Sequence, residues 1–455
     1  MSSFVDNLKQ RFSGNKFLSA VLTLVTGTAL GQAIGLLTTP IVSRLYDTVA
    51  YGEYAILVST GTILATVSQA GLAAAIMMPE DDEDAKKVFS AAIYFQFIVT
   101  VVAVCILMCV QDYIMVFDST MTYNVMLAAL LVYSLLANTT NLLRIYMNRL
   151  KLYRALFWNS LIGALATLLI TIPAGLVHAC FWGFFAAAAV SSLVCSIQMV
   201  VRANPFVRVS PKQILAILVE YKKFVLLQLP ANIVTVTSQQ LPNQVLSASL
   251  GSAALGSFSM SNKILGIPSR LLASPVNTVY FRTAVEYVHE GKDLASFTYS
   301  MVKKIMLCAA PLILILVVFG EPLFAFVLGK QWWEAGTISA IMAYQFALTF
   351  CITCTSYCRV SINRQGANLA MSFVSLGLVA LSLFVGLSIS DSIIIVIGCF
   401  AVGSCLVQII DMAVNFVCMK KYAARYILFS LVYTVIVGGI GVGLRLGFWT
   451  LMGWM

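Results

Sequence analysis

Residues 251–282 read GSAALGSFSMSNKILGIPSRLLASPVNTVYFR. The stretch is long and apolar enough to cross a membrane, yet it contains Lys263 and Arg270. Gly256 and Asn277 continue the same seven-residue spacing, which is nearly two helical turns, so we expect all four residues on one stripe of a helix. Each cation near the bilayer centre costs about 2.5–3.5 kcal/mol on the insertion scale. The stripe is therefore predicted to face protein, water or an anion rather than lipid.

The rest of the chain has the composition of a membrane protein. Of the 455 residues, 60% are hydrophobic and only 10% are charged, whereas an ordinary soluble domain carries roughly 25% charged residues. This predicts an all-α integral membrane protein with many spans. The net charge of +10 is attributed to basic loops that face the cytoplasm and anionic lipid, and not to a nucleic-acid partner.

Apolar windows of about 18 or more residues predict the spans. The first six are 17–43, 53–78, 88–110, 124–146, 156–178 and 180–201. The next six are 224–249, 252–282, 301–328, 335–359, 368–389 and 392–418. A further apolar run, about 427–449, is either an additional C-terminal helix that crosses the membrane or a partly inserted tail near Arg445.

Basic residues predict the orientation of these spans. With the N-terminal segment MSSFVDNLKQRFSGNK in the cytoplasm and the first helix uncleaved, the cytoplasmic segments hold all but five of the 28 Lys and Arg residues. The exceptions are Lys263 and Arg270 within a span and Arg44, Lys330 and Arg445 outside. Because cytoplasmic loops are enriched in Lys and Arg, we expect a multi-pass protein with a cytoplasmic N-terminus.

The longest polar connection, about 202–223, divides the first twelve spans into six plus six. We predict an N-terminal lobe at 1–201, a cytoplasmic connector at 202–223, a C-terminal lobe at 224–420 and an additional hydrophobic segment at 421–455. Residues 212–223, KQILAILVEYKK, have basic ends and an apolar middle, which is typical of an interfacial helix. Two six-helix halves without a large extramembrane domain are typical of a transporter.

Lys263 and Arg270 are the first candidates for a substrate site. A pyrophosphate drawn into a low-dielectric cavity needs fixed positive charge, for which arginine offers a planar fork and lysine a mobile point charge. We expect Lys263 ~16 Å from the outer end of its span and Arg270 nearer to the cytoplasmic side. The structural alternative is that Asp411 neutralises Arg270, or that Arg270 extends to the cytoplasmic interface.

Polar residues of other spans are candidates to line the same cavity. Arg144 follows Asn138 and Asn141 at a spacing that puts them on one stripe, although Arg144 also suits a topology anchor. Span seven has a set of amides that form either a wet face for sugar hydroxyls or bonds between helices, and its prolines Pro230 and Pro242 predict a bend. The amides are Gln239, Gln240, Asn243 and Gln244.

In the first span, Gln32 would face the cavity, while Gly27, Gly31 and Gly35 favour close helix packing.

Arg44 and Glu53 flank the first predicted external turn. They belong either to a gate or to an ion pair across a tight loop, which would contribute only ~0–1 kcal/mol. Asp411 is the acid that would take part in gating or coupling if it does not pair with Arg270.

The sequence favours neither a metal site nor a cofactor. The acidic run Glu80–Asp84 fits a solvated loop at the start of a helix, where acids complement the helix dipole. Cys351, Cys354 and Cys358 lie in an apolar run and suit buried helix positions. His178 and His289 are far apart, so no histidine metal site or catalytic triad is expected. No nucleotide-binding motif is present in the sequence, which argues against ATP hydrolysis.

Six patterns occur in order along residues 17–420. They are Arg44-Leu45-Tyr46, Gly52-Glu53-Tyr54, Ile76-Met77-Met78-Pro79 with its acidic run, Tyr221-Lys222-Lys223-Phe224, the prolines Pro230, Pro242, Pro268 and Pro275, and Gly329-x-x-Trp332-x-x-Ala335-Gly336. In these patterns the chain resembles the Wzx-type polysaccharide flippases of the multidrug/oligosaccharidyl-lipid/polysaccharide exporter superfamily.

The resemblance implies a flippase, not an enzyme, in the bacterial inner membrane. Two six-helix lobes would enclose a cationic central cavity in which Lys263 and Arg270 fit. Undecaprenyl-pyrophosphate-linked oligosaccharides would pass from the inner to the outer leaflet by alternating access, for O-antigen, capsule or exopolysaccharide. Expected partners are this substrate, membrane lipids, a coupling proton or sodium ion, and a polysaccharide polymerase complex.

Two other functions are open to this sequence. A multidrug or small-molecule antiporter of the same superfamily usually takes cations and would need buried carboxylates, for which Asp411 and Glu321 are the plausible intramembrane acids. A membrane-embedded polysaccharide-assembly enzyme would need a sizeable loop with catalytic acids. The longest loops predicted here have about twenty residues and are mainly basic. Both features favour the anionic lipid-linked substrate.

Overall fold

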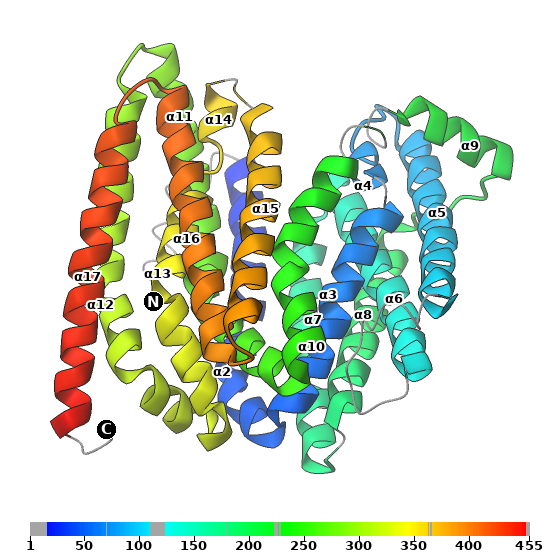
Figure 1. The fold of residues 1–455 in the computed structure, drawn as a ribbon. Helices are drawn as coiled ribbons and strands as arrows, with labels where there is room; N and C mark the ends of the chain where they lie inside the picture. Colours follow the sequence, from blue (N-terminus) through cyan, green and yellow to red (C-terminus); the bar gives the residue numbers. More distant parts are fainter. Residues whose placement is uncertain are drawn as a thin grey trace. The chain divides into compact units, whose positions relative to one another are not determined.

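The computed structural model describes residues 16–69, 71–109, 123–178, 180–222, 226, 229–362, 364 and 366–451 (Figure 1). Every regular element in these residues is a helix, and nine of the helices are long and apolar enough to cross a membrane. The prediction of an all-α, multi-pass membrane protein is confirmed. The predictions for the N-terminal segment 1–15, for Lys223 and for Phe224 concern positions outside the described residues.

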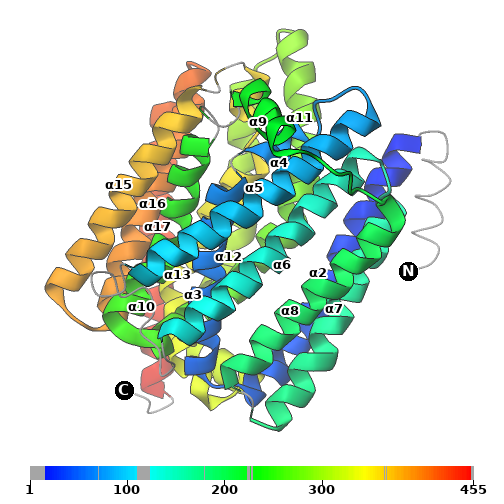
Figure 2. The same ribbon diagram turned by 90° about the vertical axis from the view of Figure 1, so that its right-hand side faces the viewer.

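The chain divides into two compact units, Met1–Val236 and Thr237–Met455. The division falls within one helix, so the lobe and connector boundaries given above stay predictions. The first unit contains α2 (Lys16–Leu45), α3 (Thr48–Gln69), α4 (Leu72–Ala75), α5 (Asp82–Cys109), α6 (Tyr123–Arg149), α7 (Tyr153–Leu176), α8 (Cys180–Ala203) and α9 (Pro211–Glu220). Within it α2 packs on α7, α7 on α8, α8 on α6 and α6 on α5 (Figure 2).

Close packing of α2 on α7 depends on small residues. A Cβ atom at Gly27 would lie 2.8 Å from the Cα atom of Phe157, and one at Gly31 would lie 3.1 Å from the carbonyl oxygen of Ser160. The expectation of close packing is confirmed at these two positions. A Cβ atom at Gly35 would meet nothing within 4 Å, so this third glycine faces open space.

The connector contains the predicted short helix, α9. Ser210 and Gln213 form a capping box at its start, which satisfies backbone N–H groups that have no partner within the helix. Ile217 is buried against a core formed by α4, α5, α6, α7 and α8, whereas Leu215 and Val219 are exposed. The helix is confirmed; its position at the membrane interface stays a prediction.

The tyrosines of the two motifs at the α2–α3 turn contact α7 and α8. The Tyr46 hydroxyl donates to the Thr171 carbonyl at 2.8 Å. The ring centroids of Tyr46 and Tyr54 lie 4.1 and 5.2 Å from that of Phe184. The two patterns Arg44-Leu45-Tyr46 and Gly52-Glu53-Tyr54 therefore build one aromatic cluster of the first unit.

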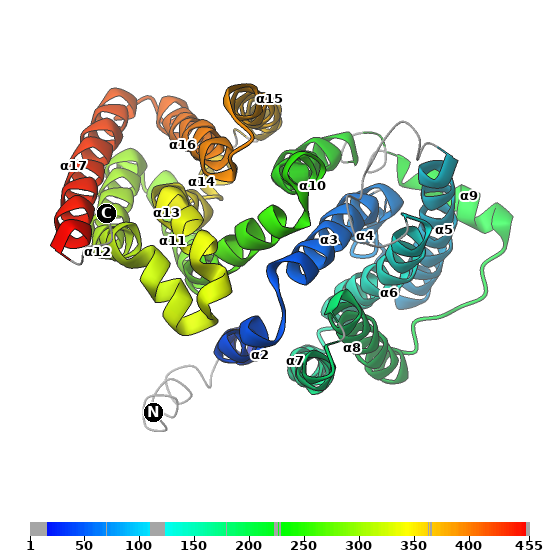
Figure 3. The same ribbon diagram turned by 60° about the horizontal axis from the view of Figure 1, so that its bottom comes forward.

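The second unit begins within α10 (Leu229–Leu265). Its further elements are a π-turn η2 (Ser269–Ala273), α11 (Ser274–His289), α12 (Leu294–Leu328), η3 (Lys330–Trp332), α13 (Trp333–Cys354), α14 (Cys358–Ser361), α15 (Gly366–Ile389), α16 (Ile393–Cys418) and α17 (Ala423–Leu451). Here α12 packs on α13 and α17, and α16 packs on α13, α15 and α17 (Figure 3). The additional C-terminal helix is confirmed as the continuous α17.

A salt bridge joins two turns of this unit. Lys421, between α16 and α17, lies 2.9 Å from the carboxylate of Asp293, which is also the N-cap of α12. The hydrogen bond from Lys421, and then that from the Ser296 N–H, holds the pKa of Asp293 below its ordinary value.

The predicted spans seven and eight are joined into one helix with a kink. Gly251 has φ 81° and ψ 174°, a conformation essentially limited to glycine, and it stands between the two predicted spans. The prediction of a single helix from 252 to 282 is wrong, because α10 ends at Leu265 and α11 begins at Ser274. Pro268 cannot donate a backbone hydrogen bond and clashes with the preceding turn, which explains the interruption.

The pattern Gly329-x-x-Trp332-x-x-Ala335-Gly336 forms the corner between α12 and α13. Gly329, with φ 116°, ends α12, and Trp332 is fully buried. A Cβ atom at Gly336 would lie 2.5 Å from the Cα of Glu321 and 2.6 Å from the carbonyl oxygen of Gly320. The two helices are therefore in backbone contact at this corner.

We predict that Gly336→Ala destabilises the protein by about 1–3 kcal/mol, since the added methyl group would overlap the α12 backbone. The measurement is the thermal unfolding midpoint of the purified protein in detergent. Gly443→Ala in α17 is the matched control, because its Cβ atom would meet nothing within 4 Å. Equal midpoints for the two variants would contradict the backbone contact.

Candidate functional site

The interruption between α10 and α11 places Lys263 and Arg270, the two cations that the sequence predicts within a span, together. The Arg270 guanidinium folds back and donates from Nη2 to the backbone carbonyl of Lys263, close to the end of α10. A cation at this position also complements the negative end of the helix dipole. Arg270 thus has a structural role as a cap that the seven-residue spacing did not reveal.

Gly266 makes room for this arrangement. A Cβ atom at Gly266 would lie 3.1 Å from Nη1 and 3.3 Å from Cζ of Arg270, so the guanidinium packs directly over the glycine. Lys263 is half-buried and Arg270 is exposed. The expected stripe through Gly256, Lys263, Arg270 and Asn277 does not lie on one continuous α-helix, because a turn at Gly266 and the π-helical residues Ser269–Ala273 separate α10 from α11.

Asn277 belongs to α11 and reaches the end of α13. Its Nδ2 donates to the Ser356 hydroxyl at 2.9 Å, while its Oδ1 is buried without a hydrogen-bond partner among the described residues. The amide thus ties α11 to the loop after α13 and leaves one acceptor for a further donor.

Asp411 pairs with Arg359 and not with Arg270. The Nη2 of Arg359 lies 2.5 Å from Oδ1 of Asp411 and donates to the Asp411 carbonyl at 2.6 Å. The Nη1 of Arg359 donates to Oδ1 of Asn368 at 2.9 Å, and Arg359 is 5% exposed. The alternative in which Asp411 neutralises Arg270 is therefore wrong. The sequence alone predicts a cytoplasmic position for Arg359, because its place at the end of an apolar run resembles that of an ordinary topology anchor.

A second intramembrane ion pair joins α12 to α17. Nη2 of Arg445 lies 2.5 Å from Oε1 of Glu321, which is 1% exposed. Pro322 cannot donate to the Val318 carbonyl, and the indole N–H of Trp449 donates to that oxygen at 3.1 Å instead. Sequence reasoning had placed Arg445 outside and had left Glu321 without a partner, because the two residues are far apart along the chain.

Some amide side chains of α10 form hydrogen bonds within the helix, and one is exposed. Asn243 donates to Gln240 at 3.0 Å within the helix, and Gln239 is exposed. Gln240 and Gln244 are half-buried. The wet face expected along this helix stays a prediction, with Gln239 as its most accessible member.

In the first unit, Asn138, Asn141 and Arg144 follow one another along α6. Asn138 is buried and donates to the Ser68 hydroxyl at 3.4 Å, which ties α6 to α3. Asn141 donates to Gln69 at 3.4 Å, and both Asn141 and Arg144 are exposed. Gln32 of α2 is exposed as well.

Arg44 and Glu53 are in different surroundings. Arg44 is exposed in the last turn of α2. Glu53 lies inside α3 and is only 3% exposed. Its role in a gate or in an ion pair with Arg44 stays a prediction. The helix α3 already begins at Thr48, which makes the α2–α3 turn two residues long. Glu53 and Glu321 are thus both buried acids, whereas Asp411 is half-buried.

Other chemical groups of the described chain are structural. The acids Asp82, Glu83 and Asp84 form the first turn of α5 and are exposed, with Asp82 3.3 Å from Arg149. Cys351, Cys354 and Cys358 are buried free thiols. No group of His, Cys, Asp or Glu within the described residues could hold a metal ion.

Solved structures share this fold. A structure described as lipid II flippase MurJ in an inward closed conformation matches with a TM-score of 0.67 at 12% identity, over 95% of this chain and 98% of that chain. A multidrug resistance MATE family transporter of the MOP superfamily, inward-facing, matches with a TM-score of 0.54 at 15% identity, over 89% and 95%. At these identities the likeness establishes the fold alone. No curated protein matches the sequence.

A family model described as polysaccharide biosynthesis protein matches residues 41–337, which is well over half of the 455 residues. The match begins in α2 and ends in α13, so it covers the tyrosine motifs, the kink at Gly251, the broken segment with Lys263 and Arg270, and the α12–α13 corner. The chain belongs to this polysaccharide biosynthesis protein family and has the fold of the MurJ and MATE transporters.

Proposed function

We propose that the protein translocates lipid-linked oligosaccharides with a pyrophosphate head group, undecaprenyl pyrophosphate being the expected carrier, across the bacterial inner membrane. The observation that carries the proposal is the broken helix with two cations at 263 and 270. Substrate sites of membrane transporters are typically formed at discontinuous helices, where backbone polar groups and charges face a cavity. A pyrophosphate bound here would meet the charges of the Lys263 ammonium and the Arg270 guanidinium.

The placement of acids in the second unit supports an anionic substrate. Its two intramembrane acids, Asp411 and Glu321, already form ion pairs with Arg359 and Arg445. A multidrug antiporter for cations would need carboxylates that are open to the substrate. Glu53 in the first unit is a further acid inside a helix, 3% exposed, and a drug-susceptibility assay of Glu53→Gln tests that second function.

The route is proposed to run from the cytoplasmic to the outer leaflet by alternating access, with a proton or sodium gradient or downstream consumption of product as the driving force. Exposed Gln239, Gln32, Asn141 and Arg144 are proposed to contact the sugars and phosphates along the route. Such a protein would act before a polysaccharide polymerase in the assembly of O-antigen, capsule or exopolysaccharide. Arg44 at the end of α2 is proposed to take part in the gate.

Replacement of both cations tests the site directly. We predict that Lys263→Ala and Arg270→Ala each lower flipping about ten-fold, since a hydrogen bond to a charged group contributes roughly 1.5–3 kcal/mol. Surface polysaccharide is measured in a strain that lacks its own flippase, with protein levels matched by immunoblot. Lys330→Ala, an exposed cation of the α12–α13 corner, is the control. Normal polysaccharide in the double variant would reject the cationic site.

Gly266→Ala tests the folded-back guanidinium without changing any charge. The new methyl group would lie 2.9 Å from the Asn262 carbonyl oxygen and 3.1 Å from Nη1 of Arg270, so the turn and the guanidinium that it carries would both have to shift. We expect reduced polysaccharide export at a normal protein level, whereas Gly443→Ala leaves export unchanged. Full export by Gly266→Ala would mean that the cap on α10 has no part in transport.

The Arg359–Asp411 pair separates a structural role from a coupling role. Asp411→Asn leaves the Arg359 charge buried and should destabilise the protein by about 3–5 kcal/mol, while Arg359→Leu with Asp411→Leu should recover most of that loss. Thermal unfolding measures the stability and polysaccharide export measures the function. A double variant that is stable but inactive would assign coupling to Asp411, and a stable, active one would assign it only packing.

A further inference from the structure

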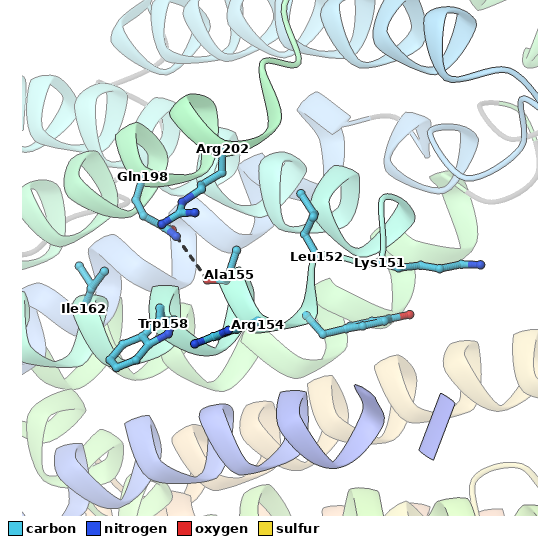
Figure 4. A pocket seen from close by; sticks show the side chains of 9 residues that line it. Lys151, Leu152, Arg154, Ala155, Trp158, Ile162, Gln198 and Arg202 are labelled. Atoms are coloured by element: carbon cyan, nitrogen blue, oxygen red, sulfur yellow. Dashed lines mark hydrogen bonds between the residues drawn. The ribbon is translucent and has the colours of Figure 1, made fainter. Parts of the chain in front are cut away.

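A second group of cations lies in the first unit. A cavity of about 800 Å³ opens between the start of α7 and the end of α8. Lys151, Arg154, Trp158 and Ile162 line it from the side of α7, and Gln198 and Arg202 line it from α8. In Figure 4 the Arg154 and Arg202 side chains lie on the same side of Ala155, and Lys151 extends to the other side.

The cavity carries three positive charges and no lining acid. Within the described residues, none of Lys151, Arg154 and Arg202 forms an ion pair or a side-chain hydrogen bond. Arg149, less than two turns before Arg154, is different because it contacts Asp82 and the Ile76 and Asp81 carbonyls. The three lining cations are thus available to an anion, whereas an ordinary structural arginine nearby is not.

Along α7 the residues that line the cavity change from charged, at Arg154, to apolar, at Trp158 and Ile162. Arg154, Trp158 and Ile162 follow at four-residue intervals and therefore share one face of α7. Trp158 is 51% exposed, and Val201, beside Arg202, is 77% exposed. A ligand that fills this groove has a negative head beside the arginines and an apolar body beside Trp158 and Ile162.

Hydrogen bonds between α7 and α8 hold the two helices together at the cavity. Gln198 donates to the Ala155 carbonyl at 3.4 Å and accepts from Nδ2 of Asn159 at 2.8 Å. Asn159 is buried and also donates to the Cys195 carbonyl at 3.0 Å. These bonds link α7 to α8 beneath the arginines, so the groove exists before any ligand arrives and costs little ordering on binding.

We propose that this groove binds the phosphate head group of an anionic phospholipid, with an acyl chain along Trp158 and Ile162. Basic pockets between membrane helices near the cytoplasmic surface suit such head groups, and the predicted orientation puts this end of α7 and α8 in the cytoplasm. A free phosphate would not use the apolar wall. The site is separate from Lys263 and Arg270, and it does not depend on what the protein transports.

The test is titration of the purified full-length protein with dioleoylphosphatidylglycerol in mixed micelles, read by native mass spectrometry. The wild type should retain this lipid at least ten-fold more tightly than dioleoylphosphatidylcholine. Arg154→Gln with Arg202→Gln should weaken binding about twenty-five-fold, at roughly five-fold for each cation that faces an anionic lipid. Arg208→Gln, an exposed arginine that does not line the cavity, should bind as the wild type.

Charge-retaining Arg154→Lys with Arg202→Lys checks the fold and should keep most of the affinity. Equal binding of the two lipids, or unchanged binding by the Gln variant, would overturn the proposal. Full competition by millimolar inorganic phosphate would assign the groove to a free anion and overturn the lipid part. Because polysaccharide export is not the readout, failure of the flippase proposal would leave these results unchanged.

Discussion

Charge inside a low-dielectric membrane needs a partner, water or an anion, and the second unit depends on this constraint. Arg359 meets Asp411, and Arg445 meets Glu321. Removal of one member of such a pair leaves a buried charge without compensation, which costs far more than the intact pair contributes. The two ion pairs therefore fix the position of α14 relative to α16 and that of α12 relative to α17.

In the α12–α17 contact, a backbone carbonyl left without a donor by a proline in α12 accepts a hydrogen bond from α17. Pro322 interrupts the hydrogen-bond ladder of α12 and leaves the Val318 carbonyl for the Trp449 indole. The Arg445 guanidinium lies 4.7 Å from the Trp449 ring centroid, contacts Glu321 and donates to the Val317 carbonyl at 3.0 Å. An indole and a guanidinium of α17 thus satisfy polar groups of α12 that lipid could not satisfy.

The broken segment between α10 and α11 answers the same constraint differently. There the Arg270 guanidinium satisfies a backbone carbonyl at a helix end, and Gly266 provides the room. The Arg270 side chain caps α10 and also carries the positive charge of the proposed substrate site. Its structural role therefore does not exclude the proposed functional one. The Arg270 charge therefore has a partner within the protein itself.

The amino-acid sequence by itself determined the helical, multi-pass class, because long apolar runs can satisfy their backbone in a membrane only as helices or closed barrels. It also determined most helix positions and a boundary between two apolar runs near Gly251, where the structure has a kink within one helix. Its prediction failed at 266–273, because Pro268 interrupts a run that hydrophobicity alone reads as continuous. Only the tertiary structure decided the partners of charged residues. Asp411 lies 52 residues from Arg359, and Glu321 lies 124 residues from Arg445. Pairing over such separations depends on which helices pack side by side, and periodicity along one helix contains no information about its neighbour.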